Sequence, residues 1–430
     1  MTTFRSTRGG PSVGVGEALA RGLAPDGGLY VPERIGRFES PGPDAHGAFR
    51  DTARWAGARL LGADAAPWLD AVVDGALDFD VPLVPLGPDR WLLELFHGPT
   101  LAFKDVGARF MARALAATGP ADAERTVLVA TSGDTGSAVA AAFHGVAGTR
   151  VVALFPRNGV ADRQRRQMTT LGGNVTAVAV DGTFDDCQRM TKEAFADAGL
   201  REAHRLTSAN SINVGRWIPQ SFYYVHAAAR SGWTEAPAPF WVVPSGNLGN
   251  LCAGLLAHRA GMPARGFLAA TNRNRPFPDF LATGRYEPRP SVATPSNAMD
   301  VGAPSNLERI QWLYSGDAAA LRSDVSAVSV DDDSTVAAMR AAYDAHGAVL
   351  DPHTAVGLAA VERIDPGAGP VVILATAHPA KFPDAVERAT GVQVDAPPAL
   401  AAALAKPEHV VSIAPTLLEL RSLLEGLSPS

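Results

Sequence analysis

The chain has 430 residues, of which 47% are hydrophobic and 19% charged, and its formal net charge at pH 7 is −6. One hydrophobic core supports roughly 250–300 residues, so more than one globular unit is expected. The apolar content excludes an intrinsically disordered chain, and the mildly acidic balance argues against a surface for nucleic acid or anionic membranes.

The chain opens with a loop-rich segment and continues as an alternation of strands and helices. Residues 1–85 carry few strand signals, which favours a helical N-terminal extension. Beyond them, short apolar runs predict strands at 126–130, 150–155, 174–180, 240–243, 266–270 and 371–375. Helical patterns lie between them at 137–146, 184–198, 219–229 and 251–260. This alternation predicts an α/β fold with mostly parallel sheets, while the proline-rich stretches 277–304 and 396–407 are expected to be surface excursions.

Three polar or glycine-rich loops each follow a predicted strand. They read TSGDTGS at 131–137, PSGNLGN at 244–250 and TAHPAKF at 376–382. In a parallel sheet such loops gather at the carboxyl edge, where ligands bind. Glycines allow the backbone to approach an anion, and the next helix directs its free N–H groups at it. Each loop alone could be an ordinary turn, but three together favour a ligand site.

A fourth segment, FHGPTLAFKD at 96–105, places Lys104 among apolar residues. A lysine at a helix start is by itself most often a surface residue. A desolvated lysine amine, however, can form a Schiff base with an aldehyde. Together with loops suited to phosphate, Lys104 suggests pyridoxal phosphate as a cofactor.

The segment NSINVGR at 210–216 places amides and a guanidinium in one short loop. Arg216 could bind phosphate or carboxylate in a bidentate manner, with a structural salt bridge as an equally weighted alternative. The arginines between 157 and 166 are expected to form a solvated helix face.

The remaining reactive side chains give weak signals. Cys187 and Cys252 are expected to be small packing residues, since two cysteines make neither a disulfide scaffold nor a zinc motif. His97, His353 and His378 show no metal-ligand spacing, so no metal is expected. We expect a cytoplasmic protein, because no secretory leader and no stretch of about 18 apolar residues is found.

The quoted motifs, taken in order, resemble the threonine synthase family, whose members are fold-type II pyridoxal-phosphate enzymes. GLAPDGGLY at 22–30 and DVGAPSN at 300–306 extend the resemblance, which runs from about residue 5 to 390. It implies two open twisted α/β domains with mostly parallel sheets. We expect an N-terminal extension (1–85), a large cofactor-binding domain (86–125 and 215–430) and a smaller substrate-binding domain (126–214).

The resemblance also assigns roles to individual residues. It makes Lys104 the lysine that forms the Schiff base with pyridoxal 5'-phosphate and acts in catalysis, and it places the hydroxyl of Thr376 at the pyridine nitrogen. It assigns the binding of the cofactor phosphate to Gly246, Asn247, Leu248, Gly249 and Asn250. It assigns the binding of the substrate amino acid to Ser132, Asp134 and Thr135, although many fold-type II relatives carry Asn at the position of Asp134. Asn210 and Arg216 are expected to grip the substrate phosphate, with Lys381 assisting.

The implied reaction is the conversion of O-phospho-L-homoserine and water to L-threonine and phosphate by β,γ-replacement. A phospho-lyase or dehydratase giving 2-oxobutyrate is the alternative within the same fold, and a non-catalytic binding paralogue is the alternative from another class. The expected partner is a small-molecule substrate, without nucleic acid or membrane, and the expected state is a monomer or homodimer.

Overall fold

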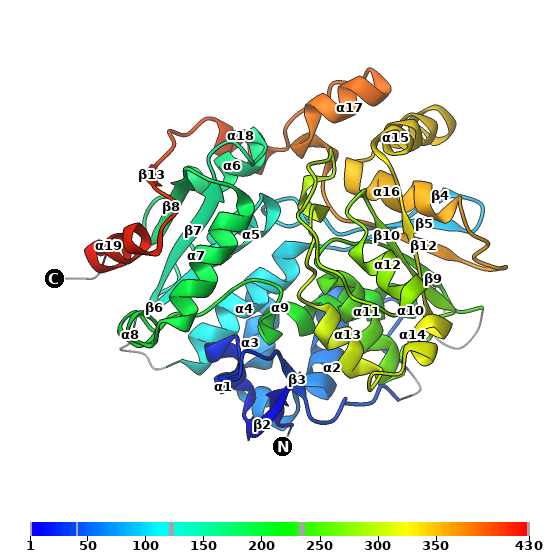
Figure 1. Cartoon of the computed structure of the whole chain (residues 1–430). Helices are drawn as coiled ribbons and strands as arrows, with labels where there is room; N and C mark the ends of the chain where they lie inside the picture. Colours follow the sequence, from blue (N-terminus) through cyan, green and yellow to red (C-terminus); the bar gives the residue numbers. More distant parts are fainter. Residues whose placement is uncertain (1, 40–41, 120–123, 232–236, 428–430) are drawn as a thin grey trace.

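The computed structural model describes residues 2–39, 42–119, 124–231 and 237–427. The other residues of the three units expected from the sequence lie outside the described residues. It contains two units built on mostly parallel sheets, with the N-terminal segment below both of them (Figure 1). The predicted α/β class with two open parallel sheets is confirmed.

The smaller sheet has four parallel strands in the order β13-β8-β7-β6. Alternate residues of a strand point to opposite faces, so Val127 and Val129 pack on one side, and Leu128 and Ala130 on the other. Its strands are β6 (Arg125–Ala130), β7 (Thr149–Pro156), β8 (Val175–Val180) and β13 (Val410–Ile413). Its helices are α5 (Asp134–Phe143), α6 (Asp162–Thr169), α7 (Phe184–Ala196), α8 (Ala198–Ala203), α18 (Pro398–Leu404) and α19 (Leu417–Leu427).

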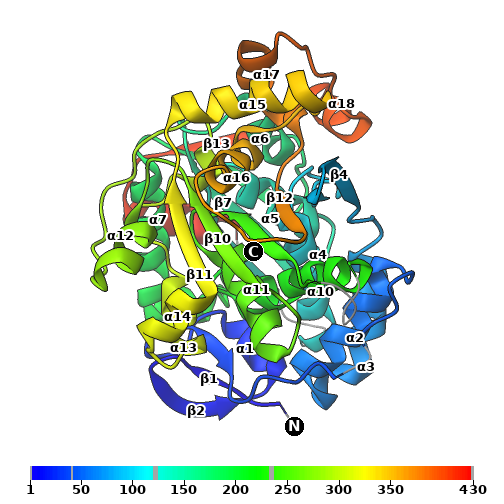
Figure 2. The ribbon, with the colours of Figure 1, turned by 90° about the vertical axis from the view of Figure 1, so that its right-hand side faces the viewer.

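The larger sheet has six strands in the order β11-β10-β9-β12-β5-β4, all parallel except β4, which pairs antiparallel with β5. Its strands are β4 (Leu83–Gly87), β5 (Arg90–Glu94), β9 (Phe240–Pro244), β10 (Gly266–Thr271), β11 (Val325–Ser329) and β12 (Val371–Ala375). Figure 2 shows β10 and β11 side by side, with α15 near the top and the N-terminal strands at the bottom.

Helices cover both faces of the larger sheet. Trp241 of β9 packs against Tyr224 of α10, with ring centroids 5.1 Å apart, whereas the next residue, Val242, belongs to the core that includes Val356 of α16. The helices of this unit are α4 (Lys104–Thr118), α9 (Val214–Trp217), α10 (Ser221–Arg230), α11 (Gly249–Ala260), α12 (Pro276–Thr283), α13 (Leu307–Leu313), α14 (Ala318–Asp324), α15 (Asp332–His346), α16 (Pro352–Val361) and α17 (Pro383–Thr390).

The N-terminal extension contains the expected helices and, in addition, a small antiparallel sheet of order β2-β1-β3. Its elements are β1 (Phe4–Ser6), β2 (Gly9–Val13), α1 (Val15–Arg21), β3 (Tyr30–Pro32), α2 (Phe49–Leu61) and α3 (Ala66–Ala76). β1 and β3 span only three residues each, and β2 holds two glycines and a proline, so no apolar run of ordinary strand length marks them in the sequence.

The C-terminal segment departs from the expected division into domains. It was expected in the large unit, but β13 pairs with β8 at the edge of the smaller sheet, and α19 packs against α7. Leu420 and Leu424 of α19 are buried in the core of the smaller unit, which explains why the segment lies there. We therefore infer that the smaller unit consists of residues 125–214 together with 398–427.

No helix within the described ranges is long and apolar enough to cross a bilayer.

Candidate active site

A pocket lies at the carboxyl ends of the strands of both sheets, where the loops after β6, β9 and β12 meet the start of α4. All the predicted site residues except Lys381 line it. These are Lys104, Ser132, Asp134, Thr135, Asn210, Arg216, Gly246, Asn247, Leu248, Gly249, Asn250 and Thr376. The fold therefore brings together residues that are up to 272 positions apart in the sequence (104 to 376).

Lys104 is the first residue of α4, and only 13% of its side chain is exposed. The loop before it is tied down at two points: the Phe103 N–H donates to the carbonyl of Thr376 at 2.9 Å, and the Asp105 carboxylate accepts from the N–H and hydroxyl of Thr100 at 2.8 and 2.6 Å. Burial lowers the pKa of Lys104 to about 8, against the opposing effect of the Asp134 carboxylate. Near neutral pH, about a tenth of the amine is therefore uncharged and nucleophilic, far more than for a lysine with the ordinary pKa of 10.5.

Asp134 begins α5 and is buried beside two lysines. Its carboxylate lies 2.6 Å from Nζ of Lys381 and 3.7 Å from Nζ of Lys104, and it accepts a hydrogen bond from Nε2 of Gln164 at 2.8 Å. Burial alone would raise the pKa of Asp134, but the charges of Lys381 and Lys104 hold it below its usual range. Asp134 is therefore ionised and accepts three polar contacts.

The loop between β9 and α11 forms a cradle that suits a phosphate group. At Gly246 a Cβ atom would lie 2.6 Å from Cα of Met299, so only glycine allows the backbone to lie this close. Leu248 adopts the left-handed conformation (φ 61°), after which α11 begins and presents its free N–H groups. Asn250 accepts hydrogen bonds from two tyrosines, and its Nδ2 is buried with no partner among the described residues. An oxyanion with hydrogen-bond acceptors fits these donors.

Arg216 is 1% exposed and lies on α9 next to α4. At Gly107, one turn beyond Lys104, a Cβ would lie 2.6 Å from the carbonyl oxygen of Arg216, so this glycine allows α9 to approach α4. Nη1 of Arg216 donates to the carbonyl of Ala209 at 2.6 Å, while its Nε is buried without a partner in the described part of the chain. Oδ1 of Asn210 is likewise unpartnered. Burial lowers the pKa of Arg216 to about 10, which leaves the guanidinium charged.

Lys381, which is expected from the sequence to assist in binding the substrate phosphate, does not line the pocket. Its side chain is 0% exposed, and its Nζ donates to the carbonyl of Thr100 at 2.8 Å as well as pairing with Asp134. These contacts direct the ammonium group at protein atoms, so it does not offer a free charge to a ligand.

Several pocket residues were not expected from the sequence. The stretch 277–304, expected as a surface excursion, supplies Ala298, Met299 and Val301 to the pocket lining. Nδ2 of Asn297 donates to Oε1 of Gln164 at 3.0 Å, which links this stretch to α6 of the smaller unit. No local motif marks such residues, because they reach the site only through the tertiary fold.

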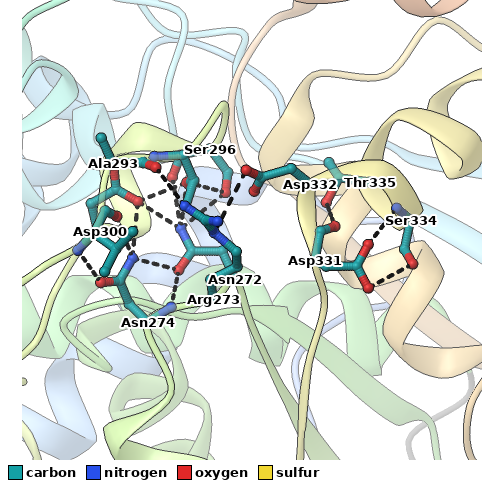
Figure 3. Close-up of polar contacts among 12 residues, drawn as sticks. Asn272, Arg273, Asn274, Ala293, Ser296, Asp300, Asp331, Asp332, Ser334 and Thr335 are labelled. Atoms are coloured by element: carbon teal, nitrogen blue, oxygen red, sulfur yellow. Dashed lines mark hydrogen bonds and ion pairs between the residues drawn. The ribbon is translucent and has the colours of Figure 1, made fainter.

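The stretch is anchored by a buried polar cluster at the end of β10, where Asn272, Asn274 and Asp300 point toward one another (Figure 3). The Asp300 carboxylate accepts from Nδ2 of Asn272 at 2.8 Å, from Nδ2 of Asn274 at 3.1 Å and from the hydroxyl of Thr294 at 2.7 Å. Burial raises the pKa of Asp300 to about 6, against the lowering effect of these hydrogen bonds. The cluster fixes the residues that close one side of the pocket.

His353 also lines the pocket, at the start of α16. Its Nε2 accepts from the N–H of Ala298 at 3.2 Å, so its Nδ1 carries the proton and donates to Asp351 at 2.7 Å. Both ring nitrogens are thus engaged by the protein. Within the described ranges, no group of three or more metal-ligating side chains is found.

Family models match almost the whole chain. A model described as "Pyridoxal-phosphate dependent enzyme" matches residues 82–377, and two models described as the N terminus and the C-terminal part of threonine synthase match residues 3–47 and 354–423. The threonine synthase of Escherichia coli (strain K12) is 41% identical over 395 residues, which cover 90% of this chain and 91% of that protein. The chain belongs to the threonine synthase family.

Other members of the family agree with this assignment. The threonine synthase of Haemophilus influenzae is 40% identical over 385 residues, covering 89% of this chain and 90% of that protein. The crystal structure of the Escherichia coli threonine synthase superimposes with a TM-score of 0.92 at 36% identity, over 99% of this chain and 100% of that one. A structure of threonine synthase with bound pyridoxal phosphate from Brucella melitensis superimposes with a TM-score of 0.89 at 35% identity, over 100% of both chains. The resemblance seen in the motifs is confirmed, and it extends past residue 390 to 423.

Proposed function

We propose that this threonine synthase family member converts O-phospho-L-homoserine and water to L-threonine and phosphate in the pocket described above. The observation that supports the proposal most directly is that Lys104 and Arg216 line one pocket, although they come from different elements. A buried amine with a lowered pKa suits reaction with an aldehyde, and a buried guanidinium with an unpartnered nitrogen suits a phosphorylated substrate.

Pyridoxal 5'-phosphate fits the residues present. Lys104 would hold its aldehyde carbon, the cradle 246–250 its phosphate, and the hydroxyl of Thr376 its ring nitrogen. The unpartnered Nδ2 of Asn250 and the glycine-only backbone approach at Gly246 support this assignment of the cradle. When bound, the cofactor supplies the electron sink that makes protons of the substrate carbon chain acidic.

The chain's own residues supply position and proton transfer. Lys104 acts as general base at the substrate α-carbon, since its pKa of about 8 lies near the working pH. Ser132, on the loop before α5, and Thr135, in the first turn of α5, hold the amino-acid end of the substrate. Asp134, ionised and buried, keeps a carboxylate beside the Lys104 amine.

Arg216 and Asn210 bind the substrate phosphate and retain it after it leaves the γ-carbon. A charge-assisted hydrogen bond in a buried site gains strength because water is excluded. The pocket lies between the two units, and the Asn297–Gln164 hydrogen bond joins them at its edge. We infer that closure of the smaller unit on the substrate excludes competing water.

The first prediction concerns products. The purified enzyme, incubated with O-phosphohomoserine, should release phosphate and L-threonine in equal amounts, and Lys104→Ala should abolish both. Lys192→Ala, which removes an exposed lysine of α7, is the matched control and should leave turnover unchanged. Phosphate with 2-oxobutyrate in place of threonine would identify a phospho-lyase. Threonine formation by Lys104→Ala would refute the assignment of the base.

We also propose that the enzyme works in the cytoplasm as a monomer or homodimer. Cys187 and Cys252 are both free and buried, which is compatible with a reducing compartment. Cell fractionation and sedimentation equilibrium of the purified enzyme test the two statements separately.

A further inference from the structure

Lys381 is a buried ammonium group that the reaction outlined above does not use. It lies on the 3₁₀ turn η4 (Pro379–Lys381), in the loop after β12, and its side chain is 0% exposed. Burying a charge is costly unless partners compensate for it, so its contacts should indicate its role.

The contacts that it makes within the described residues connect the segments that carry the central groups of the site. One is the carbonyl of Thr100, at 2.8 Å, in the loop that leads into Lys104. That loop is held from the other side by Asp105. The second is the carboxylate of Asp134, at 2.6 Å, on α5 of the smaller unit. Lys381 therefore joins the two units directly behind the Lys104 amine.

The Asp134 carboxylate faces two ammonium groups unequally. It is 2.6 Å from Lys381 but 3.7 Å from Lys104, and the amine of Lys104 lies on the pocket wall whereas that of Lys381 does not. Arg216 on α9 adds a further positive charge near Lys104. Among these groups, Lys104 is the cation with the weaker contact to Asp134 and with access to the pocket, so it is the one that gives up its proton.

We propose that Lys381 is a positioning residue: it holds Asp134 and the Thr100 loop in place and forms the closer ion pair with the Asp134 carboxylate, so that the Lys104 amine remains available in its uncharged form. This inference rests on the proposed role of Lys104 as the reactive amine. It assigns Lys381 to the protein framework of the site and not to the substrate phosphate.

The proposal makes opposite predictions for the two partners of Lys104. In Lys381→Met, the nearby positive charge is lost and Asp134 is left to pair with Lys104 alone, so the pKa of Lys104 should rise by about one pH unit or more. In Asp134→Asn, the only carboxylate contacting Lys104 in the described ranges is removed, so the pKa should fall. In Lys381→Arg, which keeps the charge, it should stay close to the wild-type value.

The measurement uses the small number of lysines in the chain. The sequence contains only Lys104, Lys192, Lys381 and Lys406, so ¹³Cε-lysine labelling gives four signals, each assigned by its Lys→Met variant. The full-length enzyme is freed of cofactor, its integrity is checked by recovery of the cofactor spectrum on adding pyridoxal phosphate, and the Lys104 signal is titrated against pH. Lys192→Met is the control and should leave the Lys104 midpoint in place.

An unchanged Lys104 midpoint in folded Lys381→Met would overturn the proposal, as would a rise in Asp134→Asn. If Lys381→Met fails to fold, Lys381→Arg and Asp134→Asn decide: the first must titrate like the wild type and the second must titrate lower, and any other result overturns the proposal. The product assay with Lys104→Ala tests the underlying function independently, since it does not depend on which group neighbours the amine.

Discussion

Arg216 and Arg309 are both buried arginines, and their contacts distinguish Arg216, which we propose to bind the substrate phosphate, from a structural arginine. Arg309 donates to the carbonyls of Tyr30, Ser211 and Ile212 and to Oδ1 of Asn306, so its guanidinium is saturated by the protein. Within the part of the chain that the structure describes, Arg216 has one such contact, to Ala209, and an unpartnered Nε. An unsatisfied buried cation is costly for folding, so its presence beside the pocket is explained by a ligand that completes its contacts.

Arg216→Ala should lower kcat/KM for O-phosphohomoserine by about thirty- to a thousandfold, which corresponds to about 2–4 kcal/mol for one buried charge-assisted pair. Because the phosphate both anchors the substrate and leaves during the reaction, kcat should fall and KM should rise. The cofactor absorbance should remain, since the cradle at 246–250 is separate. Arg340→Ala on the exposed face of α15 serves as control. Loss of the cofactor spectrum with unchanged kinetics after cofactor is restored would instead place Arg216 at the cofactor.

At the scale of elements, the sequence predicts the strands of the two large sheets that are mostly buried and misses the more exposed ones. β12 (Val371–Ala375) is predicted at its observed bounds, because all five residues are apolar and buried. β13 (Val410–Ile413) was missed: it lies at a sheet edge, three of its four residues are exposed, and its pairing depends on β8, more than 200 residues away. The same holds for Arg165 and Arg166, which were expected on a solvated face. They bind Glu408 and the carbonyl of Leu404, so the C-terminal segment covers that face of α6.

The candidate site shows the same limit. The three strand-to-helix loops could be predicted, because each carries its glycines and polar residues within one short stretch. The partners of Asp134 could not: Gln164, Lys104 and Lys381 come from three different elements, and their arrangement depends on how the two units pack. The sequence motif places Lys381 near the ligand, but it does not reveal the contacts of Lys381 with Asp134 and the carbonyl of Thr100.

Gly246→Ala tests the contact between the cradle and the 277–304 stretch. The added Cβ would lie 2.6 Å from Cα and 3.1 Å from the carbonyl of Met299, and neither backbone atom can move independently. We expect the stretch to shift and the affinity for pyridoxal phosphate to fall by about tenfold or more, at about 1.4 kcal/mol per factor of ten. Titration of the cofactor-free enzyme by absorbance measures this. Gly426→Ala, where an added Cβ meets nothing within 4 Å, should bind normally. An unchanged affinity in Gly246→Ala would show that the two segments are not packed this tightly.

On the scale of the whole molecule, the N-terminal extension forms part of the main core. Phe49, Ala53 and Leu60 of α2 belong to the same buried cluster as Tyr223 and the larger sheet. A polar contact is enclosed there: the Thr52 hydroxyl lies 3.0 Å from Nδ1 of His226 on α10. Since Nε of Arg230 donates to Nε2 of His226 at 2.9 Å, Nδ1 bears the proton and donates to Thr52. The imidazole is thus buried in its neutral form. We therefore expect the contact between α2 and α10, called the joint below, to be sensitive to acid.

This joint predicts how stability depends on pH. Burial, with the charge of Arg230, lowers the pKa of His226 from 6.5 to about 4. Between these values the unfolded chain binds more protons than the folded one, so the contribution is complete above pH 6.5 and is lost as the pH falls toward 4. From pH 7.5 to 5, His226 should therefore cost the wild type about 2 kcal/mol of unfolding free energy. His226→Gln, which stays neutral, should lose less over this range in urea denaturation, while His46→Gln at an exposed site should lose as much as the wild type. Equal losses in all three proteins would show that His226 does not control the acid sensitivity of the joint.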